Sequence, residues 1–318
     1  MVRLRRKGKK MNRNVSASIL VGRLSRRAAV ARFTAASAAI TVAALGNSPL
    51  PVQGAPAFAG SSVVSTKKGI VMTDATPTPD FTPLTVMLVH GAFADASGWG
   101  GVIERLHDAG VSVTAPPNLL RSVQQDSAYI SSMLSQISGP VLLVGHSYGG
   151  VVISNAAAKA NKVVGLVYVA AFAPDEGETL MGIEGDSKDS VLNSSLLTLQ
   201  YPTGKGAETA VEFAIAPKYF HEAFCADLPV EQAAVMAAGQ RPCAALAFSE
   251  VSGAPAWKSL PSWAVIPTGD KAAGTDVLRT MAKRAGATVT EVDGSHAIMI
   301  SQPQAVTDVI LSAINVVA

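Results

Sequence analysis

The segment with the clearest chemical potential is the pentapeptide Gly145-His146-Ser147-Tyr148-Gly149, which lies between a short apolar run and a stretch of helical periodicity. This G-x-S-x-G pattern between a strand and a helix is typical of a sharp turn that exposes a serine hydroxyl above the edge of a sheet. The start of the following helix favours negative charge beside that hydroxyl. The pattern therefore predicts Ser147 as the nucleophile of an acyl-transfer reaction.

A serine nucleophile needs a neighbouring base, and the chain contains five histidines. His296 follows the last expected strand, at residues 288–292. A loop after such a late strand is where an enzyme built on a sheet can bring a base to its active edge. We therefore predict His296 as the general base and interpret His90 as a brace for its own loop. The other histidines, in helical stretches or inside the serine turn, are His107, His146 and His221.

An acid is needed to hold the imidazole in the right tautomer and to stabilise its charged form. Asp270 follows the apolar run at residues 263–266, and the chain order Ser147, Asp270, His296 is the order expected when a serine turn of this kind belongs to a triad. We therefore predict Asp270 as the acid. Asp175, which follows an earlier apolar run, is the alternative acid.

Acyl transfer also requires N–H donors aimed at the oxyanion of the tetrahedral intermediate. One donor is expected from the residue after the nucleophile, which is the backbone N–H of Tyr148. The second is expected from the loop His90-Gly91-Ala92-Phe93, which follows the first clear apolar run. By position we predict the backbone N–H of Ala92 for this role, with Phe93 as the alternative.

The elements that must position these residues follow from an alternation of apolar runs with helical periodicity. Such an alternation predicts an α/β fold with a mostly parallel sheet flanked by helices, and nearly continuous apolar runs fit strands covered on both faces. The expected strands are residues 84–89, 111–115, 141–144, 163–169, 263–266 and 288–292. The expected helices are residues 99–109, 125–137, 148–160, 275–285 and 303–316.

Between about residues 175 and 255 the alternation stops, and the pattern is mostly helical with no clear apolar strand. We interpret this stretch as a helical cap inserted into a sheet domain that spans residues 60–318. The cap residues expected to line an apolar pocket are Phe213, Tyr219, Phe220, Phe224 and Met236.

The N-terminal segment differs from the rest of the chain in charge. Eleven of the 26 Lys and Arg residues lie between Arg3 and Arg32, and no Asp or Glu precedes Asp74. This basic segment is followed by an apolar stretch at residues 33–45 and then by a small-x-small site that ends at Ala59. Secretory signals have this order of basic, apolar and small residues.

The same order predicts that residues 1–59 are a leader, starting at Met1 or Met11, that is removed on export to the periplasm or the extracellular space. The pair Arg26-Arg27 fits the twin-arginine route in part. An uncleaved anchor and an organellar transit peptide are the alternatives for this segment. The apolar stretch is shorter than a membrane span, which needs about 20 residues. It lies within the leader, so no stable membrane insertion is expected after the leader is removed.

Composition and motif spacing exclude several function classes. The sequence has no cluster of His, Cys and carboxylates with metal-ligand spacing and no phosphate-binding glycine fingerprint before a helix, so neither a metal nor an organic cofactor is expected. The basic residues that could attract nucleic acid lie in the leader, so we expect a small-molecule substrate and no nucleic-acid partner. The two cysteines, Cys225 and Cys243, allow either one disulfide or two buried thiols.

Several of these segments together resemble the α/β-hydrolase family, and most closely its small serine-esterase branch, which also includes plant methylesterases and hydroxynitrile lyases. The segments are VMLVHGAF, LLVGHSYGG, LVYVAAFAPDEGE, IPTGDKAA and EVDGSHAIMISQP, and the resemblance spans roughly residues 84–316. It implies an α/β-hydrolase fold and cleavage of carboxylic esters through a Ser-His-Asp triad and an acyl-enzyme. A lyase or a cofactor-free oxygenase on the same fold is the alternative.

Two positions distinguish ester hydrolysis from lyase chemistry within this resemblance. The lyases of the branch have a lysine directly after the catalytic histidine, and they have a threonine in place of the glycine after the first loop histidine. The present chain has Ala297 and Gly91 at those positions. Both departures favour ester hydrolysis.

Overall fold

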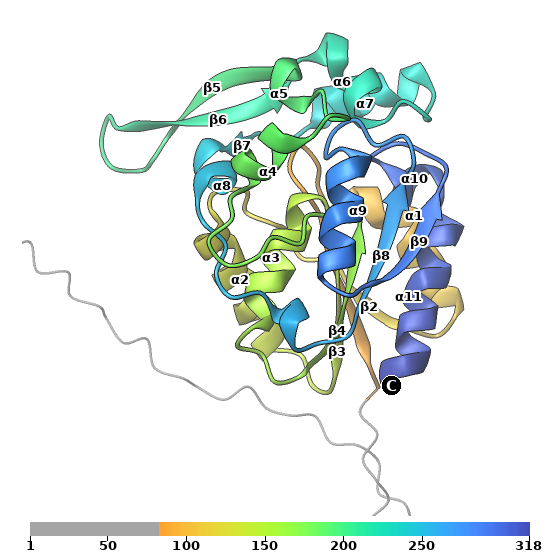
Figure 1. The fold of residues 1–318 in the computed structure, drawn as a ribbon. Helices are drawn as coiled ribbons and strands as arrows, with labels where there is room; N and C mark the ends of the chain where they lie inside the picture. The colour runs from red at the N-terminus through yellow and green to blue at the C-terminus, as the bar shows by residue number, and fades with distance from the viewer. Residues whose placement is uncertain (1–82) are drawn as a thin grey trace, which may run out of the picture. The chain divides into compact units, whose positions relative to one another are not determined.

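Six strands form one parallel sheet in the order β2-β1-β3-β4-β8-β9 (Figure 1). The structure is a computed structural model, and it describes residues 83–318. The strands are β1 (Thr85–Val89), β2 (Ser112–Thr114), β3 (Val141–His146), β4 (Val163–Val169), β8 (Ser262–Pro267) and β9 (Thr288–Val292). Each neighbouring pair of strands is parallel, which confirms the predicted α/β fold class.

The sheet forms because its central strands are almost wholly apolar. Every residue of β3 and β8 is buried, and β1 and β4 each contain one partly exposed residue. Strands that are covered on both faces must be apolar throughout, because neither face reaches water. The edge strand β9 has the more polar sequence TVTEV and is largely exposed.

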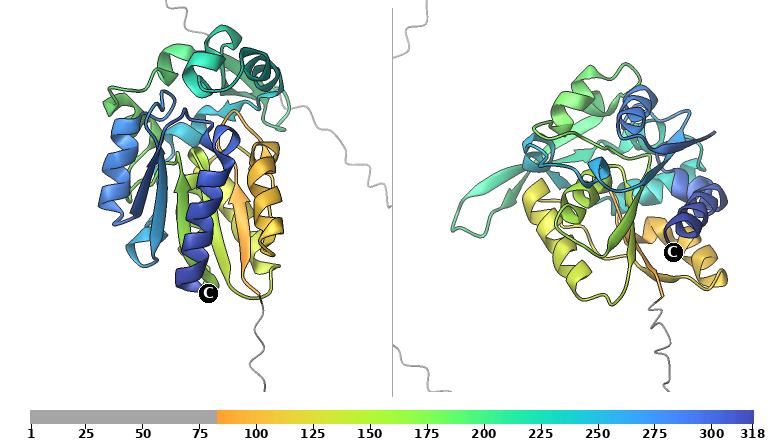
Figure 2. Two further views of the ribbon diagram at one scale, coloured as in Figure 1. Left: turned by 90° about the vertical axis from the view of Figure 1, so that its right-hand side faces the viewer. Right: turned by 60° about the horizontal axis from the view of Figure 1, so that its bottom comes forward.

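Helices cover both faces of this sheet. The helices of the sheet domain are α1 (Gly100–Asp108), α2 (Val123–Ser135), α3 (Tyr148–Ala157), α9 (Thr275–Arg284), α10 (Ile298–Ser301) and α11 (Pro303–Val317), with a 3-10 turn, η1 (Ala96–Trp99), before α1. α1 packs with α11 on one face, and α2 packs with α3 on the other (Figure 2). The hydroxyl of Ser122 accepts the N–H of Gln125 and so caps the start of α2.

A cap of about 80 residues is inserted between β4 and β8, above the edge where the parallel strands end (Figure 1). Its elements are α4 (Leu180–Asp186), α5 (Leu192–Ser195), β5 (Leu196–Pro202), β6 (Thr209–Ile215), α6 (Pro217–Phe224), α7 (Val230–Gly239), β7 (Cys243–Ala244), α8 (Ala245–Ser249) and a 3-10 turn, η2 (Ala256–Lys258). The carboxyl edge of a parallel sheet is where such folds bind their ligands.

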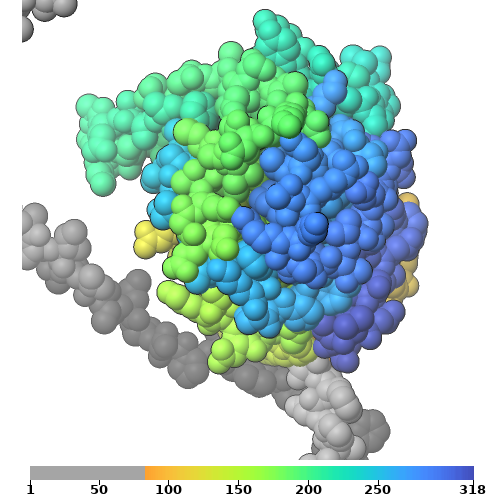
Figure 3. Space-filling model, in the orientation of Figure 1, coloured from red at the N-terminus to blue at the C-terminus, as the bar shows by residue number. Residues whose placement is uncertain are grey.

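The expectation that the cap lacks strands is wrong. Strands β5, β6 and β7 form a three-stranded antiparallel sheet, and the β5–β6 hairpin projects beyond the body of the protein (Figure 3). Both strands of the hairpin are largely exposed or only partly buried, so their sequences, LLTLQYP and TAVEFAI, mix polar and apolar residues. A strand without a fully buried face has no continuous apolar run to reveal it.

The two cysteines are separate buried thiols, so the disulfide considered from the sequence is not formed. Cys225 ends α6, where its Sγ lies 4.0 Å from the carbonyl oxygen of Phe220. Cys243 is in β7, opposite Phe213 of β6. Burial raises the pKa of Cys225 to about 12 and the pKa of Cys243 well above its ordinary value, so both thiols are protonated and unreactive.

The predicted leader, residues 1–59, and the cleavage site predicted after Ala59 lie outside the described residues. Within residues 83–318, none of the helices combines the length and the apolar character needed to cross a membrane.

Candidate active site

Ser147 lies at the turn from β3 into α3, and its backbone has an unusual conformation for a residue with a side chain, with φ 53° and ψ −124°. Its N–H donates to the carbonyl oxygen of Val169 at 3.3 Å. Its own carbonyl accepts the N–H groups of Gly150 at 2.9 Å and Phe172 at 3.2 Å. Strained conformations persist only where the surroundings impose them, and these three hydrogen bonds hold the serine at the start of the helix.

Two glycines allow the chain to approach this turn closely. A Cβ atom on Gly145 would lie 2.7 Å from the carbonyl carbon and oxygen of Gly149. A Cβ atom on Gly91 would lie 2.5 Å from the Cβ of Ser147 and 2.8 Å from the carbonyl oxygen of His146. No real side chain tolerates such contacts, so both positions require glycine, and the loop after β1 lies directly against the serine.

His296 and Asp270 form a buried pair at the same edge of the sheet. The Nδ1 of His296 lies 2.7 Å from Oδ2 of Asp270, and each residue is only 1% exposed. The other carboxylate oxygen, Oδ1, accepts the backbone N–H groups of Ala272 and Ala273, both at 2.9 Å. With its acceptor sites occupied in this way, the carboxylate fixes the imidazole with the hydrogen on Nδ1 and leaves Nε2 as the acceptor.

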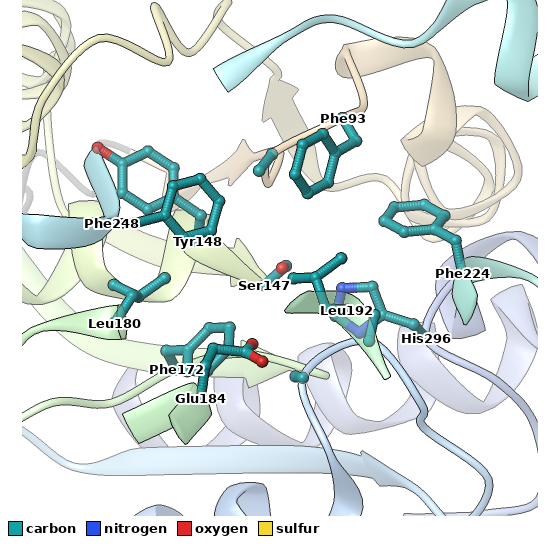
Figure 4. Close-up of a pocket in the computed structure, with 13 residues that line it drawn as sticks. Phe93, Ser147, Tyr148, Phe172, Leu180, Glu184, Leu192, Phe224, Phe248 and His296 are labelled. Atoms are coloured by element: carbon teal, nitrogen blue, oxygen red, sulfur yellow. The ribbon is translucent and has the colours of Figure 1, made fainter. Parts of the chain in front are cut away.

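The imidazole of His296 and the hydroxyl of Ser147 line the same pocket and lie next to each other (Figure 4). The structure thus brings together the three residues that the sequence singled out as Ser147, Asp270 and His296. In this arrangement Nε2 of the histidine can accept a proton from the serine hydroxyl while the carboxylate stabilises the imidazolium that results.

The alternative acid, Asp175, does not take part in this arrangement. Its carboxylate forms an ion pair with Lys258 of η2 at the surface, and its backbone N–H donates to Glu178 at 2.8 Å. The hydrogen bond from Lys258 holds the pKa of Asp175 below its ordinary value. The geometry therefore favours Asp270 over Asp175 as the acid, because His296 faces Asp270.

His146 has a structural role that the sequence did not reveal. Its ring is fully buried, and Nε2 lies 3.0 Å from the carbonyl oxygen of His296. Burial, together with the nearby His296, lowers the pKa of His146 well below its ordinary value, so the ring is neutral and Nε2 carries the donated hydrogen. The two imidazole rings also pack with centroids 4.7 Å apart. His146 therefore helps to position the loop of His296 from a position 150 residues earlier in the chain.

The remaining histidines lie apart from Ser147 or brace the chain. In His90, Nδ1 faces the carbonyl oxygen of Gly91 at 3.0 Å, and Nε2 accepts the backbone N–H of Asn118 at 2.9 Å. Burial lowers the pKa of His90 to about 4, so the ring is neutral, in agreement with a bracing role. His107 is exposed on α1, and His221 bonds to the carbonyl oxygen of Leu228 in the cap.

The N–H groups predicted for the oxyanion belong to residues that line the pocket with Ser147. These residues are Ala92 and Tyr148, together with Phe93, the alternative to Ala92. Among the described residues, the backbone N–H groups of Ala92 and Phe93 have no hydrogen-bond partner. Both are therefore free to donate to a bound oxyanion, and the structure leaves the choice between them open.

The pocket around Ser147 is narrow and almost entirely apolar. Its free volume is about 10 Å³, close to the space that one water molecule needs. A larger cavity of about 210 Å³ lies next to it, and Phe93 and Phe224 contribute to both. Of the aromatic and methionine residues expected to line a pocket, Phe220 and Met236 line the larger cavity.

The two other cap residues expected at the pocket do not line it. Phe213 packs against Phe248, a lining residue, with ring centroids 5.9 Å apart. Tyr219 is 39% exposed and lies over a different part of the surface.

Glu184 of α4 is the third polar side chain in the pocket, and the sequence did not single it out. Leu180 and Glu184 are four residues apart on one helix and are the two buried residues of α4, so they face the pocket together. Burial raises the pKa of Glu184 to about 8. The helical spacing could have indicated that this glutamate faces inward, but only if the bounds of α4 had been known.

The described residues contain no group of three or more His, Cys, Asp and Glu that could hold a metal ion. The polar side chains of the pocket, Ser147, Glu184 and His296, are suited to nucleophilic and proton-transfer chemistry on a carbonyl compound.

Comparisons with known proteins agree with this architecture. The profile described as the alpha/beta hydrolase family matches residues 86–309. A carbendazim hydrolyzing esterase from Nocardioides sp. (strain SG-4G) is 38% identical over 84 residues, which are 26% of this chain and 32% of that esterase. The chain therefore matches less than a third of the length of this curated relative.

Solved structures show the same fold. The structure of polyneuridine aldehyde esterase superposes with a TM-score of 0.63 at 21% identity, covering 73% of this chain and 99% of that one. A methylesterase from Arabidopsis gives a TM-score of 0.61 at 20% identity, with the same coverage. Methylketone synthase I from tomato, in complex with 2-tridecanone, gives 0.60 at 20% identity, covering 75% of this chain and 100% of that one.

Proposed function

The chain belongs to the alpha/beta hydrolase family, and from this premise we propose that it is a serine esterase that cleaves a small carboxylic ester through an acyl-enzyme. The observation that carries the proposal is the 2.7 Å contact of Asp270 with His296, a residue that lines the same pocket as Ser147. The esterase names of a curated relative and of two structural neighbours support it.

In the acylation step, the hydroxyl oxygen of Ser147 attacks the ester carbonyl carbon while Nε2 of His296 takes the hydroxyl proton. Asp270 stabilises the imidazolium that forms, because its carboxylate accepts the Nδ1 hydrogen. The negative charge on the carbonyl oxygen is held by the backbone N–H groups of Tyr148 and of Ala92 or Phe93. Collapse of the tetrahedral intermediate breaks the ester bond, and His296 returns the proton to the leaving alcohol.

In the deacylation step, water replaces the alcohol. His296 removes a proton from the water, the resulting hydroxide attacks the acyl carbon, and the proton is then given back to the oxygen of Ser147. The products are the free acid and the regenerated enzyme. Each step uses only side chains and N–H groups that line the pocket, together with Asp270 behind His296, so the proposal requires neither a metal nor an organic cofactor.

The lyase alternative is disfavoured by Ala297 and Gly91, the two positions that separate hydrolysis from lyase chemistry. The side chain of Ala297 is fully buried, and its N–H donates to the carbonyl oxygen of Phe224 at 3.1 Å. The space beside Gly91 is filled by Ser147 and His146. Neither position presents a cation or a hydroxyl to the pocket.

The proposal is tested with a panel of 4-nitrophenyl esters of increasing acyl length, assayed with the wild type and with Ser147→Ala. We expect the wild type to release 4-nitrophenol and to react with a fluorophosphonate probe at Ser147, as seen by peptide mass spectrometry. Ester hydrolysis that persists in Ser147→Ala, or a probe attached elsewhere, would exclude the mechanism. A lyase or an oxygenase would act on its substrate without accumulating an acyl-enzyme after rapid quenching.

We also propose that the chain is exported and that residues 1–59 are removed in the process. The support is the basic, apolar and small-residue order of this segment. Intact-mass analysis of protein secreted by an expressing cell is expected to give an N-terminus at or next to Gly60. A mature protein that still begins at Met1 or Met11 would contradict the proposal.

A further inference from the structure

Glu184 is a buried carboxyl that the proposed mechanism does not use, although it lies in the pocket of the nucleophile. It is only 4% exposed, and its carboxyl oxygens turn towards the middle of the pocket that Ser147 and His296 also line (Figure 4). Among the described residues, its Oε1 is buried and has no hydrogen-bond partner. A buried polar atom without a partner is costly, and because this one lines the pocket, a bound ligand can supply the partner.

The contacts of the other oxygen indicate where the proton of this carboxyl lies. Oε2 of Glu184 is 2.8 Å from the hydroxyl of Ser190, and the same hydroxyl is 2.6 Å from the carbonyl oxygen of Ala272. A serine hydroxyl has one hydrogen and a carbonyl oxygen can only accept, so the shorter contact takes the hydrogen of Ser190. The contact with Glu184 then requires a hydrogen on Oε2, which makes the carboxyl neutral.

The electrostatic surroundings lead to the same protonation state. The charged groups close enough to affect the carboxyl are Asp270 and Asp276, and both are acidic. Asp276, on α9, already accepts hydrogen bonds from Ser187 and from the backbone of Lys188. An ionised Glu184 would therefore be a buried anion beside other anions without a counter-ion, and its raised pKa follows from that position.

The rest of the pocket offers little else for polar recognition. Apart from Ser147, His296 and Glu184, its lining side chains are apolar or aromatic. The hydroxyl of Tyr148 turns away and donates to Asp126 at 2.8 Å. A neutral carboxyl with its hydrogen on Oε2 presents Oε1 as a carbonyl-type acceptor, so Glu184 is the one side chain of this lining that can accept a hydrogen bond without taking part in the triad.

We propose that Glu184 is a specificity-determining residue that accepts a hydrogen bond from the substrate, and that the substrates are uncharged, mainly apolar esters with one O–H or N–H donor. This inference rests on the proposed esterase function. The O–H or N–H donor of the substrate bonds to Oε1 of Glu184. The apolar lining of the pocket disfavours charged groups on the rest of the substrate.

The test compares esters that differ only in a hydroxyl against a methyl group of similar size. On the acyl side the pair is the 4-nitrophenyl esters of 3-hydroxybutyrate and 3-methylbutyrate. On the alcohol side the pair is 4-hydroxyphenyl acetate and 4-methylphenyl acetate. The ratio of kcat/KM within each pair is measured in the wild type and in each variant, so that the intrinsic reactivity of the esters cancels.

Glu184→Leu is expected to lower the hydroxyl-to-methyl ratio of at least one pair by about threefold to tenfold, the range of one hydrogen bond. Glu184→Gln is expected to retain the ratio, because the amide can donate to Ser190 and still present an oxygen to the substrate. Asp186→Asn, on the exposed side of the same helix, is the control and is expected to leave every ratio unchanged. Circular dichroism and thermal unfolding check that each variant is folded.

Two results would overturn the proposal. Equal ratios in the wild type and in Glu184→Leu for all pairs would show that Glu184 accepts no hydrogen bond from the substrate. If Glu184→Gln lowers the hydroxyl-to-methyl ratio as much as Glu184→Leu does, the wild type must bind the substrate hydroxyl through a charged carboxylate and not through a neutral acceptor.

A binding measurement separates this proposal from the esterase proposal. The dissociation constants of the same pairs are measured with Ser147→Ala and with Ser147→Ala/Glu184→Leu, in which turnover is not needed. If the wild type hydrolyses none of the esters but the hydroxyl preference in binding depends on Glu184, only the esterase proposal fails. If hydrolysis depends on Ser147 but the binding preference is the same in both proteins, only the role of Glu184 fails.

Discussion

The floor of the pocket and the cap above it differ in how closely their side chains are held. The floor consists of the loops that carry Ser147, Asp270 and His296, where backbone hydrogen bonds and buried contacts fix each functional group. The cap, from α4 to α8, exposes large apolar side chains, including Leu197 on β5 and Val235 on α7.

From this difference we expect the floor to carry out proton transfer and the cap to select the substrate. Proton transfer requires donors and acceptors held at hydrogen-bonding distance, which a rigid sheet edge provides. Substrate choice requires a surface that can adapt, and the free volume of about 10 Å³ beside Ser147 is far too small for an ester. Side chains of this lining, which come from the floor, as Phe93 does, and from the cap, as Leu180 does, are therefore expected to shift when a substrate binds.

The largest expected effect comes from removing the reacting groups of the floor. We expect Ser147→Ala and His296→Ala each to lower kcat for the best ester by about four to six orders of magnitude, because each abolishes the same proton transfer. The double variant is expected to be no worse than either single one. Steady-state kinetics with active-site titration of the wild type measures this, and strictly multiplicative losses would show that the two residues do not act as a unit.

A smaller but still large loss is expected for the acid. Asp270→Asn keeps the shape but favours the wrong tautomer of His296, so kcat is expected to fall by about three to four orders of magnitude. Asp175→Asn is the matched control and is expected to change kcat by less than about twofold, because its carboxylate is paired with Lys258 at the surface. The reverse pattern would restore Asp175 as the acid.

The sequence predicted the floor well because its signals are local. The turn around Ser147 and the loop of Asp270 follow apolar strands, the loop of His296 follows the edge strand β9, and parallel strands bring their carboxyl ends to one edge. Those signals predict that the three residues lie at one edge of the sheet.

The cap and the tertiary contacts were harder to predict for identifiable reasons. The β5–β6 hairpin has no fully buried face and hence no continuous apolar run. The bond from His146 to the carbonyl of His296 and the contact of Ser190 with Ala272 join segments far apart in the chain. No pattern within one segment encodes such a contact, so the neutral ring of His146 and the buried carboxyl of Glu184 emerge only from the folded structure.

A third prediction compares glycines of the floor and the cap. Gly91→Ala would place a methyl group 2.5 Å from the Cβ of Ser147, so we expect the free energy of unfolding to fall by about 2–4 kcal/mol and the activity to fall with it. Gly239→Ala, in α7, would meet no atom within 4 Å and is expected to be neutral or to stabilise the protein by up to about 1 kcal/mol. Urea unfolding measures both, and equal effects would show that the floor is no more tightly packed than the cap.

Glu184 is also expected to make the stability of the protein depend on pH. Its pKa is about 8 in the folded protein and near 4.5 in the unfolded chain, so between these values the folded state binds more protons. The contribution of Glu184 to the free energy of unfolding is therefore complete below about pH 4.5 and is lost as the pH rises to about 8. The free energy of unfolding falls over this range by at most about 1.4 kcal/mol per pH unit.

The amide of glutamine cannot ionise, so Glu184→Gln is expected not to show this fall in the free energy of unfolding. Its free energy of unfolding, relative to that of the wild type, should rise steadily between pH 5 and pH 8, as measured by urea unfolding at each pH. Asp186→Asn, exposed on the same helix, is expected to follow the wild type. Curves for Glu184→Gln and the wild type that run parallel over this range would mean that Glu184 is already ionised in the folded protein. The cap would then hold a buried charge above the nucleophile, and substrate recognition there would have to involve a cation.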